Sequence, residues 1–250
     1  MTPFLTRRAV LKSVGAVMAT TTFRRPRITA ADSPISPVMQ RLSTYMSEAA
    51  TRALPQEVMA KTAYHVLDTV AAMVSGTELL PGRVALGFAR MYDEKVAMIA
   101  GSNRLCGPIE AAFVNAMLAH ADETDDSHAP SQSHPGCAVV PAALAVGEQF
   151  GVSGTHLLRA VALGYDVGTR LTMAVGVPGF ETATHVSTHA LASLFGAAAA
   201  SAAAASLDAQ RMRWVVDYRR SRRPGPRPGS GIPTTFRRHS YLLVWGRAAA

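Results

Sequence analysis

Residues 191–206 consist mostly of alanine, and Phe195 followed by Gly196 interrupts the run. Alanine has the highest intrinsic helix propensity, and its short side chain allows neighbouring helices to approach closely. We therefore predict that this segment is a central helix against which other helices pack. The chain is also poor in aromatic residues, at 6%, and in β-branched runs, so we predict an all-α domain. Its 250 residues are enough to bury one or two cores.

Apolar residues recur at helical spacing along most of the chain from Pro37 onward. Some helix starts are also visible, because Pro55 and Pro108 stand at first-turn positions and Ser153 is a good N-cap. Besides 191–206, the predicted helices begin at Pro37 and then cover 55–76, 81–92, 109–119, 139–150 and 154–175. A short extended run is predicted over 96–101 and a glycine- and proline-containing loop over 176–188.

The formal net charge of +8 is unevenly distributed along the chain. Residues 1–30 carry six basic residues and 219–250 carry eight arginines, both without an acidic residue, which leaves −6 for 31–218. An acidic body argues against a nucleic-acid partner, since only the two ends could attract phosphate. No uncharged apolar run reaches about 18 residues, so we expect no membrane span in the body. The two cysteines, Cys106 and Cys137, are too few for a disulfide framework.

The N-terminus resembles a twin-arginine export signal. Arg7 and Arg8 precede an apolar, uncharged stretch over 13–23, and small residues follow later. A basic cluster over 24–27 is unusual for such a signal. We expect residues 1–31 to be a disordered leader that directs export to the periplasm, and a basic leader on a cytoplasmic protein is the alternative.

The densest concentration of reactive groups lies between two predicted apolar helices, over residues 120–134. This stretch contains four carboxylates and three histidines, namely Asp122, Glu123, Asp125, Asp126, His120, His128 and His134. Functional groups favour loops held by rigid elements, although an acidic connector would have a similar composition. A carboxylate beside a histidine can orient it for proton transfer near neutral pH. A second pair, His185 and His189, stands at the start of the alanine-rich helix and could face this loop.

Two other polar groups fit local helix-surface interactions better than a functional site. They are His65 with Asp68, and Tyr165 with Asp166 and Arg170. The loop residues Asp122, Asp125 and His128 offer metal-binding atoms, but their spacing is typical of no metal site that we recognise. We therefore predict neither a metal nor a cofactor.

The loop and its neighbours also match a family pattern. Asn115-Ala-Met-Leu-Ala-His120-Ala-Asp-Glu-Thr-Asp-Asp-Ser-His128 is followed by His134-Pro135-Gly136, and further matches are Gly164-Tyr165-Asp166-Val167 and Phe195-Gly196-Ala-Ala-Ala-Ala. On these motifs, residues 37–218 resemble the MmgE/PrpD family, which includes 2-methylcitrate dehydratase, cis-aconitate decarboxylase and related lyases and isomerases. The resemblance implies a large N-terminal helical domain, a smaller α/β lid domain, an active site between them, and a homodimer.

In the decarboxylase-like members of this family, the catalytic loop reads His-x-x-Asp-x-Asp-Asp-Thr and then His-Pro. Registered on the paired aspartates, the site residues that the resemblance implies are Glu123 for the first acid, Asp125 and Asp126 for the pair, Ser127 for the threonine and His134 for the His-Pro histidine. A further family histidine precedes the alanine-rich helix, and both His185 and His189 compete for its position. The resemblance implies that the carboxylates bind or orient and that His134 and one later histidine transfer protons.

The composition changes after Tyr218. Residues 219–231 are rich in arginine, proline and glycine, lack a helical period and cannot bury a core. Read from the third base of the first codon, permitted codons for 231–246 spell Asp-Pro-Asp-His-Val-Ser-Lys-Ala-Phe-Val-Leu-Val-Gly-Met-Gly, which resembles the family's His-x-x-Lys-Ala-Phe region. We therefore expect a frameshift after about Tyr218, a basic disordered tail over 219–250, and loss of the lid domain. A stop codon soon after the shift would contradict this expectation.

Two functions are consistent with these observations. The first is a cofactor-independent lyase or isomerase fragment that acts on a small carboxylate by acid–base elimination (dehydration or decarboxylation) or by isomerisation. Because the second half of the site is expected to be missing, we expect weak or no activity from this chain alone. The second is an inactive remnant or a noncatalytic binding module.

Overall fold

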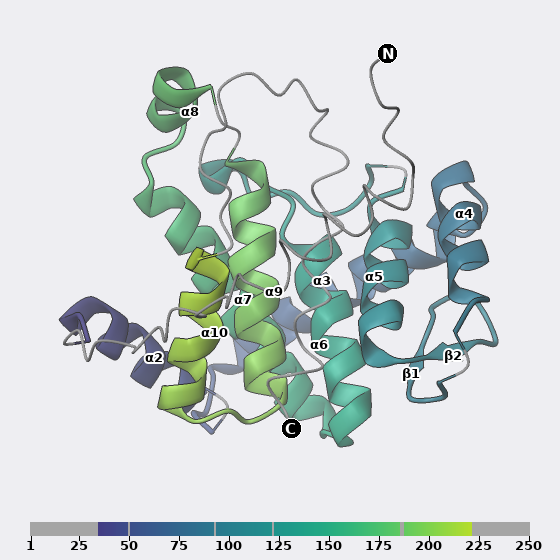
Figure 1. Ribbon diagram of the computed structural model, residues 1–250, viewed down its shortest axis with the longest axis horizontal. Coiled ribbons are helices and arrows are strands. Elements are labelled where there is room, and N and C mark those ends of the chain that lie inside the picture. Colours follow the sequence, from purple (N-terminus) through teal and green to yellow (C-terminus); the bar gives the residue numbers. More distant parts are fainter. Residues whose placement is uncertain (1–34, 50, 93, 122, 186–187, 222–250) are drawn as a thin grey trace, which may run out of the picture. The chain divides into compact units, whose positions relative to one another are not determined.

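The computed structural model describes residues 35–221 other than 50, 93, 122 and 186–187. In chain order the elements (Figure 1) are α2 (Pro37–Ala49), α3 (Gln56–Gly76), α4 (Leu80–Ala89), β1 (Ala97–Met98), β2 (Leu105–Cys106), α5 (Pro108–Ala119), η1 (Ala129–Ser131), α6 (Gly136–Phe150), α7 (Gly154–Ala174), α8 (Gly179–Thr184), α9 (His189–Ala204) and α10 (Ala209–Ser221). Apart from two short strands, the elements of the described residues are helical, which confirms the all-α prediction. The expected leader over 1–31 lies outside the described residues.

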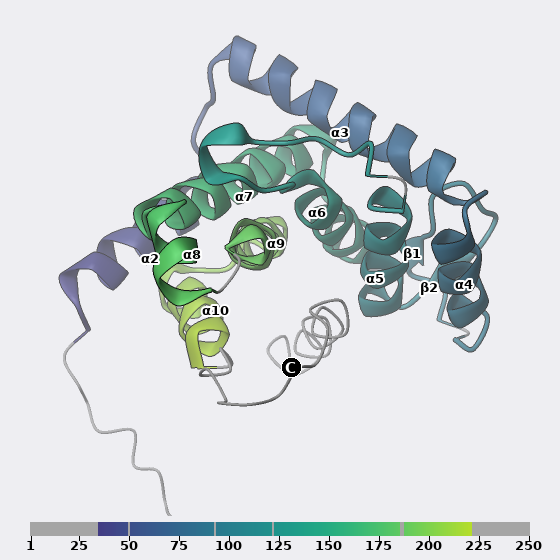
Figure 2. The same cartoon turned by 90° about the horizontal axis from the view of Figure 1, so that it is seen from above.

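Helix α9 lies among the other helices, as its alanine content predicts. It packs against α7, α6 and α10, and Figure 2 shows it end-on between them. The crossing with α7 is close at two glycines, because a Cβ on Gly164 would lie 2.8 Å from the carbonyl oxygen of Gly196. The same Cβ would lie 2.6 Å from Val139 Cγ1 of α6. The spacing of three helices therefore depends on the absence of a side chain at this crossing.

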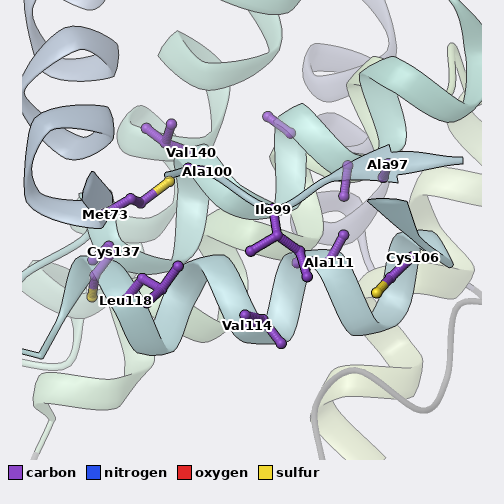
Figure 3. Packing of buried hydrophobic residues seen from close by; sticks show 14 of the residues in the cluster. Met73, Ala97, Ile99, Ala100, Cys106, Ala111, Val114, Leu118, Cys137 and Val140 are labelled. Carbon is purple, nitrogen blue, oxygen red and sulfur yellow. The ribbon is translucent and has the colours of Figure 1, made fainter. Parts of the chain in front are cut away.

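Two groups of buried apolar side chains form the core. The first joins α3, α4, α5, α6, α7, α9 and the two strands around Met73, Ile99 and Leu118, all fully buried (Figure 3). The second joins α2, α6, α7, α9 and α10 around the fully buried Met46 and Met212. Helices α6, α7 and α9 contribute residues to both groups, so they connect the two parts of the core.

The predicted extended run forms a short antiparallel hairpin, in which β1 and β2 pair Ala97 with Cys106. Asn115 of α5, which is 3% exposed, attaches this hairpin to the helices. Its Oδ1 accepts a hydrogen bond from the Ala100 N–H at 2.9 Å, and its Nδ2 donates to the Met98 carbonyl at 2.9 Å. These bonds satisfy backbone groups that the short hairpin leaves unpaired.

Most of the predicted helices are confirmed, with differences at their ends. The predicted N-cap is confirmed, since Ser153 Oγ accepts a hydrogen bond from the His156 N–H at 3.3 Å. Helix α4 ends at Ala89, before the predicted end at 92, and α8 occupies part of the predicted loop over 176–188. Helix α10 continues to Ser221, past the composition change, and the rest of the expected tail lies outside the described residues. Among the described helices, none is long and apolar enough to cross a membrane.

Candidate active site

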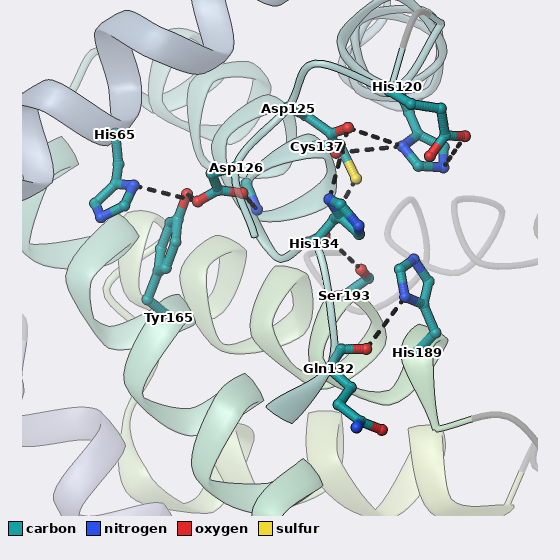
Figure 4. Close-up of polar contacts among 12 residues, drawn as sticks. His65, His120, Asp125, Asp126, Gln132, His134, Cys137, Tyr165, His189 and Ser193 are labelled. Carbon is teal, nitrogen blue, oxygen red and sulfur yellow. Dashed lines mark hydrogen bonds and ion pairs between the residues drawn. The ribbon is translucent and has the colours of Figure 1, made fainter. Parts of the chain in front are cut away.

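The loop between α5 and α6 directs its two consecutive aspartates to different partners. Figure 4 shows Asp125 facing His120 and His134, whereas Asp126 faces Tyr165 and His65. The loop thus separates two polar networks, and only the first gathers several of the predicted site residues.

Asp125 is the centre of the first network. Its side chain is fully buried, and each carboxylate oxygen lies 3.2 Å from His120 Nδ1. Its Oδ1 also lies 3.8 Å from Nδ1 of His134, a buried nitrogen that has no hydrogen-bond partner among the described residues. A buried carboxylate requires polar or charged partners, because removing it from water is costly. Asp125 therefore orients His120 by hydrogen bonds and lies within ion-pair distance of His134.

Glu123 approaches the same network from the solvent side. Its Oε1 lies 3.4 Å from His120 Nε2, and 70% of its side chain is exposed. Glu123 has a φ of 59°, in the left-handed region that residues other than glycine seldom adopt. This turn after α5 brings Glu123 back toward His120, so that both ring nitrogens of His120 face a carboxylate.

His189 adds a third imidazole. It is the first residue of α9, and its ring centre lies 5.0 Å from that of His134 and 6.4 Å from that of His120. Its Nδ1 lies 3.3 Å from the Gln132 carbonyl oxygen. The Ser193 hydroxyl, one turn further along α9, donates to the His134 carbonyl at 3.2 Å. These two contacts hold the loop against the first turn of α9.

Glu181 of α8 organises the start of α9. Its Oε1 accepts hydrogen bonds from the backbone N–H of Thr188 at 2.6 Å and from the Thr188 hydroxyl at 2.8 Å. These bonds, the backbone bond first, lower the pKa of Glu181, so that it is a carboxylate at neutral pH. Thr188 immediately precedes His189, and the anchored residue therefore helps to place the third imidazole.

Asp126 forms the second network, which joins three helices. Its Oδ1 accepts a hydrogen bond from the Gly136 N–H of α6 at 2.9 Å. Its Oδ2 accepts one from the Tyr165 hydroxyl of α7 at 2.5 Å and lies 3.2 Å from Nδ1 of His65, on α3. The rings of His65 and Tyr165 are in contact, with centres 4.9 Å apart. We call this set, Asp126, Tyr165, His65 and the Gly136 N–H, the Asp126 network.

The Asp126 network pairs a charged acceptor, Asp126, with a neutral hydroxyl donor, Tyr165. Burial raises the pKa of Asp126, but hydrogen bonds from His65, Tyr165 and the Gly136 N–H outweigh it and lower the pKa overall. Burial and the adjacent Asp126 charge raise the pKa of Tyr165. The Tyr165 hydroxyl therefore remains a donor, and Asp126 an ionised acceptor, across the neutral range.

Among the residues that the structure describes, one group of side chains has the composition of a metal site. The ligand atoms of His120, Asp125 and Cys137 lie within 4.8 Å of one another. Each atom is already engaged, because His120 and Asp125 hydrogen-bond to each other and the Cys137 thiol donates to the His134 carbonyl at 3.2 Å. The group is thus complete as a hydrogen-bond network. Of the alternative metal set considered from the sequence, Asp122 lies outside the described residues, and His128 Nδ1 contacts Ser131 Oγ at 2.7 Å.

Comparison with known proteins identifies the domain. The family model for the MmgE/PrpD N-terminal domain matches residues 40–235, which is more than half of the chain. The chain belongs to the MmgE/PrpD family. The similarity to this family therefore extends over the whole helical domain and is not limited to the loop motifs.

Relatives of this MmgE/PrpD chain include cis-aconitate decarboxylases. The enzyme of Aspergillus terreus is 25% identical over 146 residues, which cover 56% of this chain and 30% of the relative. A cis-aconitate decarboxylase-like protein of Aspergillus oryzae is 27% identical over 157 residues, covering 59% of this chain and 33% of the relative. The Homo sapiens enzyme is 30% identical over 125 residues, covering 47% and 26%. The matched regions thus span about a third or less of each relative.

The structure brings together four of the residues that the MmgE/PrpD motif implies, namely Glu123, Asp125, His134 and His189. Asp126 is adjacent in the chain but belongs to its own network, and Ser127, which follows it, is exposed. His185 is exposed at the end of α8, with a φ of 52°, and is absent from the ring contacts recorded among the described histidines. Of the two competing histidines, His189 is therefore the one beside the loop. The catalytic roles of all these residues remain predictions.

Three residues of the two networks were not predicted as site residues. His120 was part of the recognised loop, and its position three residues before Glu123 and five before Asp125 could have indicated its contacts. Tyr165 was assigned to a local group with Asp166, but it bonds Asp126 instead, whereas Asp166 does pair with Arg170 at 2.6 Å as predicted. The pairing of His65 with Asp68 was wrong: His65 lies against Asp126, because α3 faces the loop. Nothing local in the sequence indicated these last two contacts.

Proposed function

We propose that the Asp125 cluster, consisting of His120, Asp125, His134 and His189, supplies acid–base groups for a lyase that acts on a small carboxylate. The observation that carries this proposal is a fully buried carboxylate between two imidazoles, with a third imidazole 5.0 Å from one of them. Such an arrangement can hold one imidazole as a base and another as an acid near neutral pH.

Each residue has a distinct proposed role. Asp125 orients its imidazole neighbours and compensates their positive charge, and Glu123 does the same for the solvent side of His120. His134 and His189 transfer protons. In a dehydration, one imidazole removes the proton α to a carboxylate while the other protonates the departing hydroxyl, which leaves as water. In a decarboxylation, carbon dioxide leaves and an imidazolium protonates the resulting carbanion.

The histidines and the relatives together support a small carboxylate as the substrate. A protonated imidazole is a cationic partner for a carboxylate, whereas Glu123 and Asp125 disfavour an additional unpaired negative charge. The relatives' names make cis-aconitate the first compound to test. Decarboxylation of cis-aconitate is the leading reaction, and dehydration of a β-hydroxy carboxylate is the second.

A binding and turnover experiment tests the proposal. Protein labelled with ¹⁵N-histidine is titrated with cis-aconitate, and product formation is followed in the same samples by proton NMR. We expect saturable shifts of the His134 and His189 side-chain signals. We also expect Asp125→Asn to reduce any turnover by about 10²-fold or more, the range for general acid–base groups. Asp68→Asn, an exposed carboxylate on α3, is the matched control and should behave as wild type.

The proposal is wrong if neither cis-aconitate nor citrate shifts these histidine signals while the domain is folded. Measurable turnover that is equal in wild type and Asp125→Asn would also contradict it, because the cluster would then have no part in the reaction.

A further inference from the structure

We propose that the Asp126 network is a positioning device for the Asp125 cluster, in which Asp126, Tyr165 and His65 set the separation of Asp125 and His134. The effect on turnover rests on the proposed function, but the structural claim does not. Asp126, Tyr165 and His65 would act through other residues, since the Asp125 cluster holds the groups proposed to transfer protons.

The first argument is the place of the anchored atoms in the chain. Asp126 directly follows Asp125, and Gly136 follows His134 by two residues. The 2.9 Å hydrogen bond from the Gly136 N–H to Asp126 therefore closes the loop just outside both site residues. Any change at this bond must alter the backbone positions from which Asp125 and His134 extend.

The second argument is the rigidity of the surrounding contacts. Tyr165 and His65 come from α7 and α3, two helices of 21 residues each, and both approach the same carboxylate oxygen. The side chain of Asp126 is only 9% exposed, so these bonds are largely shielded from water. Charge-assisted hydrogen bonds in such surroundings are stronger and more directional than exposed ones.

The third argument is steric, because the side chains of Asp126 and Tyr165 pack closely against Gly136. A Cβ added at Gly136 would lie 2.6 Å from Asp126 Oδ1 and 2.6 Å from the Tyr165 hydroxyl. Real side chains do not approach so closely, so the Asp126 carboxylate and the Tyr165 hydroxyl can occupy these positions only because residue 136 is glycine. The close contacts thus give a steric reason for glycine at this position of the His-Pro-Gly motif.

Three variants test the network, and one is their control. Tyr165→Phe removes only a hydroxyl, and Asp126→Asn removes the charge. Gly136→Ala retains every polar group but displaces the Asp126 carboxylate and the Tyr165 hydroxyl. Tyr45→Phe is the matched control, because Tyr45 donates a similar hydrogen bond, of 2.8 Å, to Asp166 away from the loop. Thermal unfolding of each variant establishes that the domain is folded.

The decisive measurement is the ¹⁵N and proton NMR signal of the His134 side chain, assigned with His134→Gln. We expect it to shift in all three network variants and to be unchanged in Tyr45→Phe. Where turnover is measurable, we expect kcat to fall by about 10²-fold in the network variants, because a displacement of about 1 Å can have that effect. KM should change by less than about threefold, since the substrate-contacting groups are retained.

The outcomes separate this proposal from the proposed function. An unchanged His134 signal in folded Tyr165→Phe and Gly136→Ala would overturn the positioning role, whatever the activity. A shifted His134 signal in a protein that neither binds nor converts small carboxylates would support the positioning role and contradict the proposed function. If Asp126→Asn does not fold, the other two variants decide.

Discussion

Replacing Gly164 by alanine tests the close crossing of α7 and α9, on which both the core and the site depend. The new methyl carbon would lie 2.6 Å from Val139 Cγ1, 2.8 Å from Ala200 Cβ and 2.8 Å from the Gly196 carbonyl oxygen. These atoms belong to α6 and α9, so the methyl group can be accommodated only if the helices separate. Overpacking of this kind lowers the free energy of unfolding by about 1–3 kcal/mol.

The intrinsic preference of alanine for helices opposes this loss, and a second variant isolates it. Gly87 in α4 is also a helical glycine, but a Cβ there would meet no atom within 4 Å. Gly87→Ala should therefore raise the free energy of unfolding by about 0.5–1 kcal/mol through propensity alone. Because Gly164→Ala has the same propensity gain, the two variants should differ by about 1–3 kcal/mol, with Gly164→Ala the less stable.

Urea unfolding followed by circular dichroism measures this difference. For a domain of this size, about 1–3 kcal/mol corresponds to a difference in Tm of roughly 2–12 °C. The dependence on urea concentration should be similar in both variants, since both expose the same surface on unfolding. If Gly164→Ala is as stable as Gly87→Ala, the helices are not in the contact described, and the argument that α9 places His189 beside the loop fails with it.

Two further predictions concern the site. The hydrogen bonds that lower the pKa of Asp126 stabilise the fold at pH values above the ordinary aspartate pKa of 3.8. This stabilisation is lost as the pH falls through and below that value. The stability difference between wild type and Asp126→Asn should therefore shrink on acidification. Urea midpoints between about pH 2.5 and 7 measure this, and a pH-independent difference would refute it. His189→Gln should abolish the cis-aconitate-dependent shift of the His134 signal, whereas His185→Gln should retain it, because only His189 has its ring beside His134. Equal effects of the two variants would show that the ring geometry does not select between them.

The lyase proposal and the positioning proposal assign different roles to the neighbouring carboxylates of Asp125 and Asp126. Asp125 is fully buried between imidazoles, and Asp126 is held by a tyrosine, a histidine and a backbone N–H. A conservative change from Asp to Asn at either position removes one negative charge. Both changes are expected to lower turnover, but for different reasons: the first removes a group of the Asp125 cluster itself, whereas the second acts through the position of His134.

The sequence by itself determined the helical class, most helix positions and the loop that carries the site. These properties are local: alanine content and the spacing of apolar residues act within a few turns, and the loop motif is contiguous in the chain. The candidate site residues Glu123, Asp125 and His134 could be predicted from the sequence for the same reason, since all three lie within one short segment.

Only the tertiary structure decided which distant residues meet this loop. The sequence left His185 and His189 as equal candidates, and the packing of α9 against α7 places His189 beside His134. Likewise, Tyr165 had a nearby ionic group on its own helix, yet it bonds Asp126, which is 39 residues away in the chain. Such contacts depend on the separation and crossing of packed helices, and here a pair of glycines permits that separation. Local periodicity carries no information on this geometry.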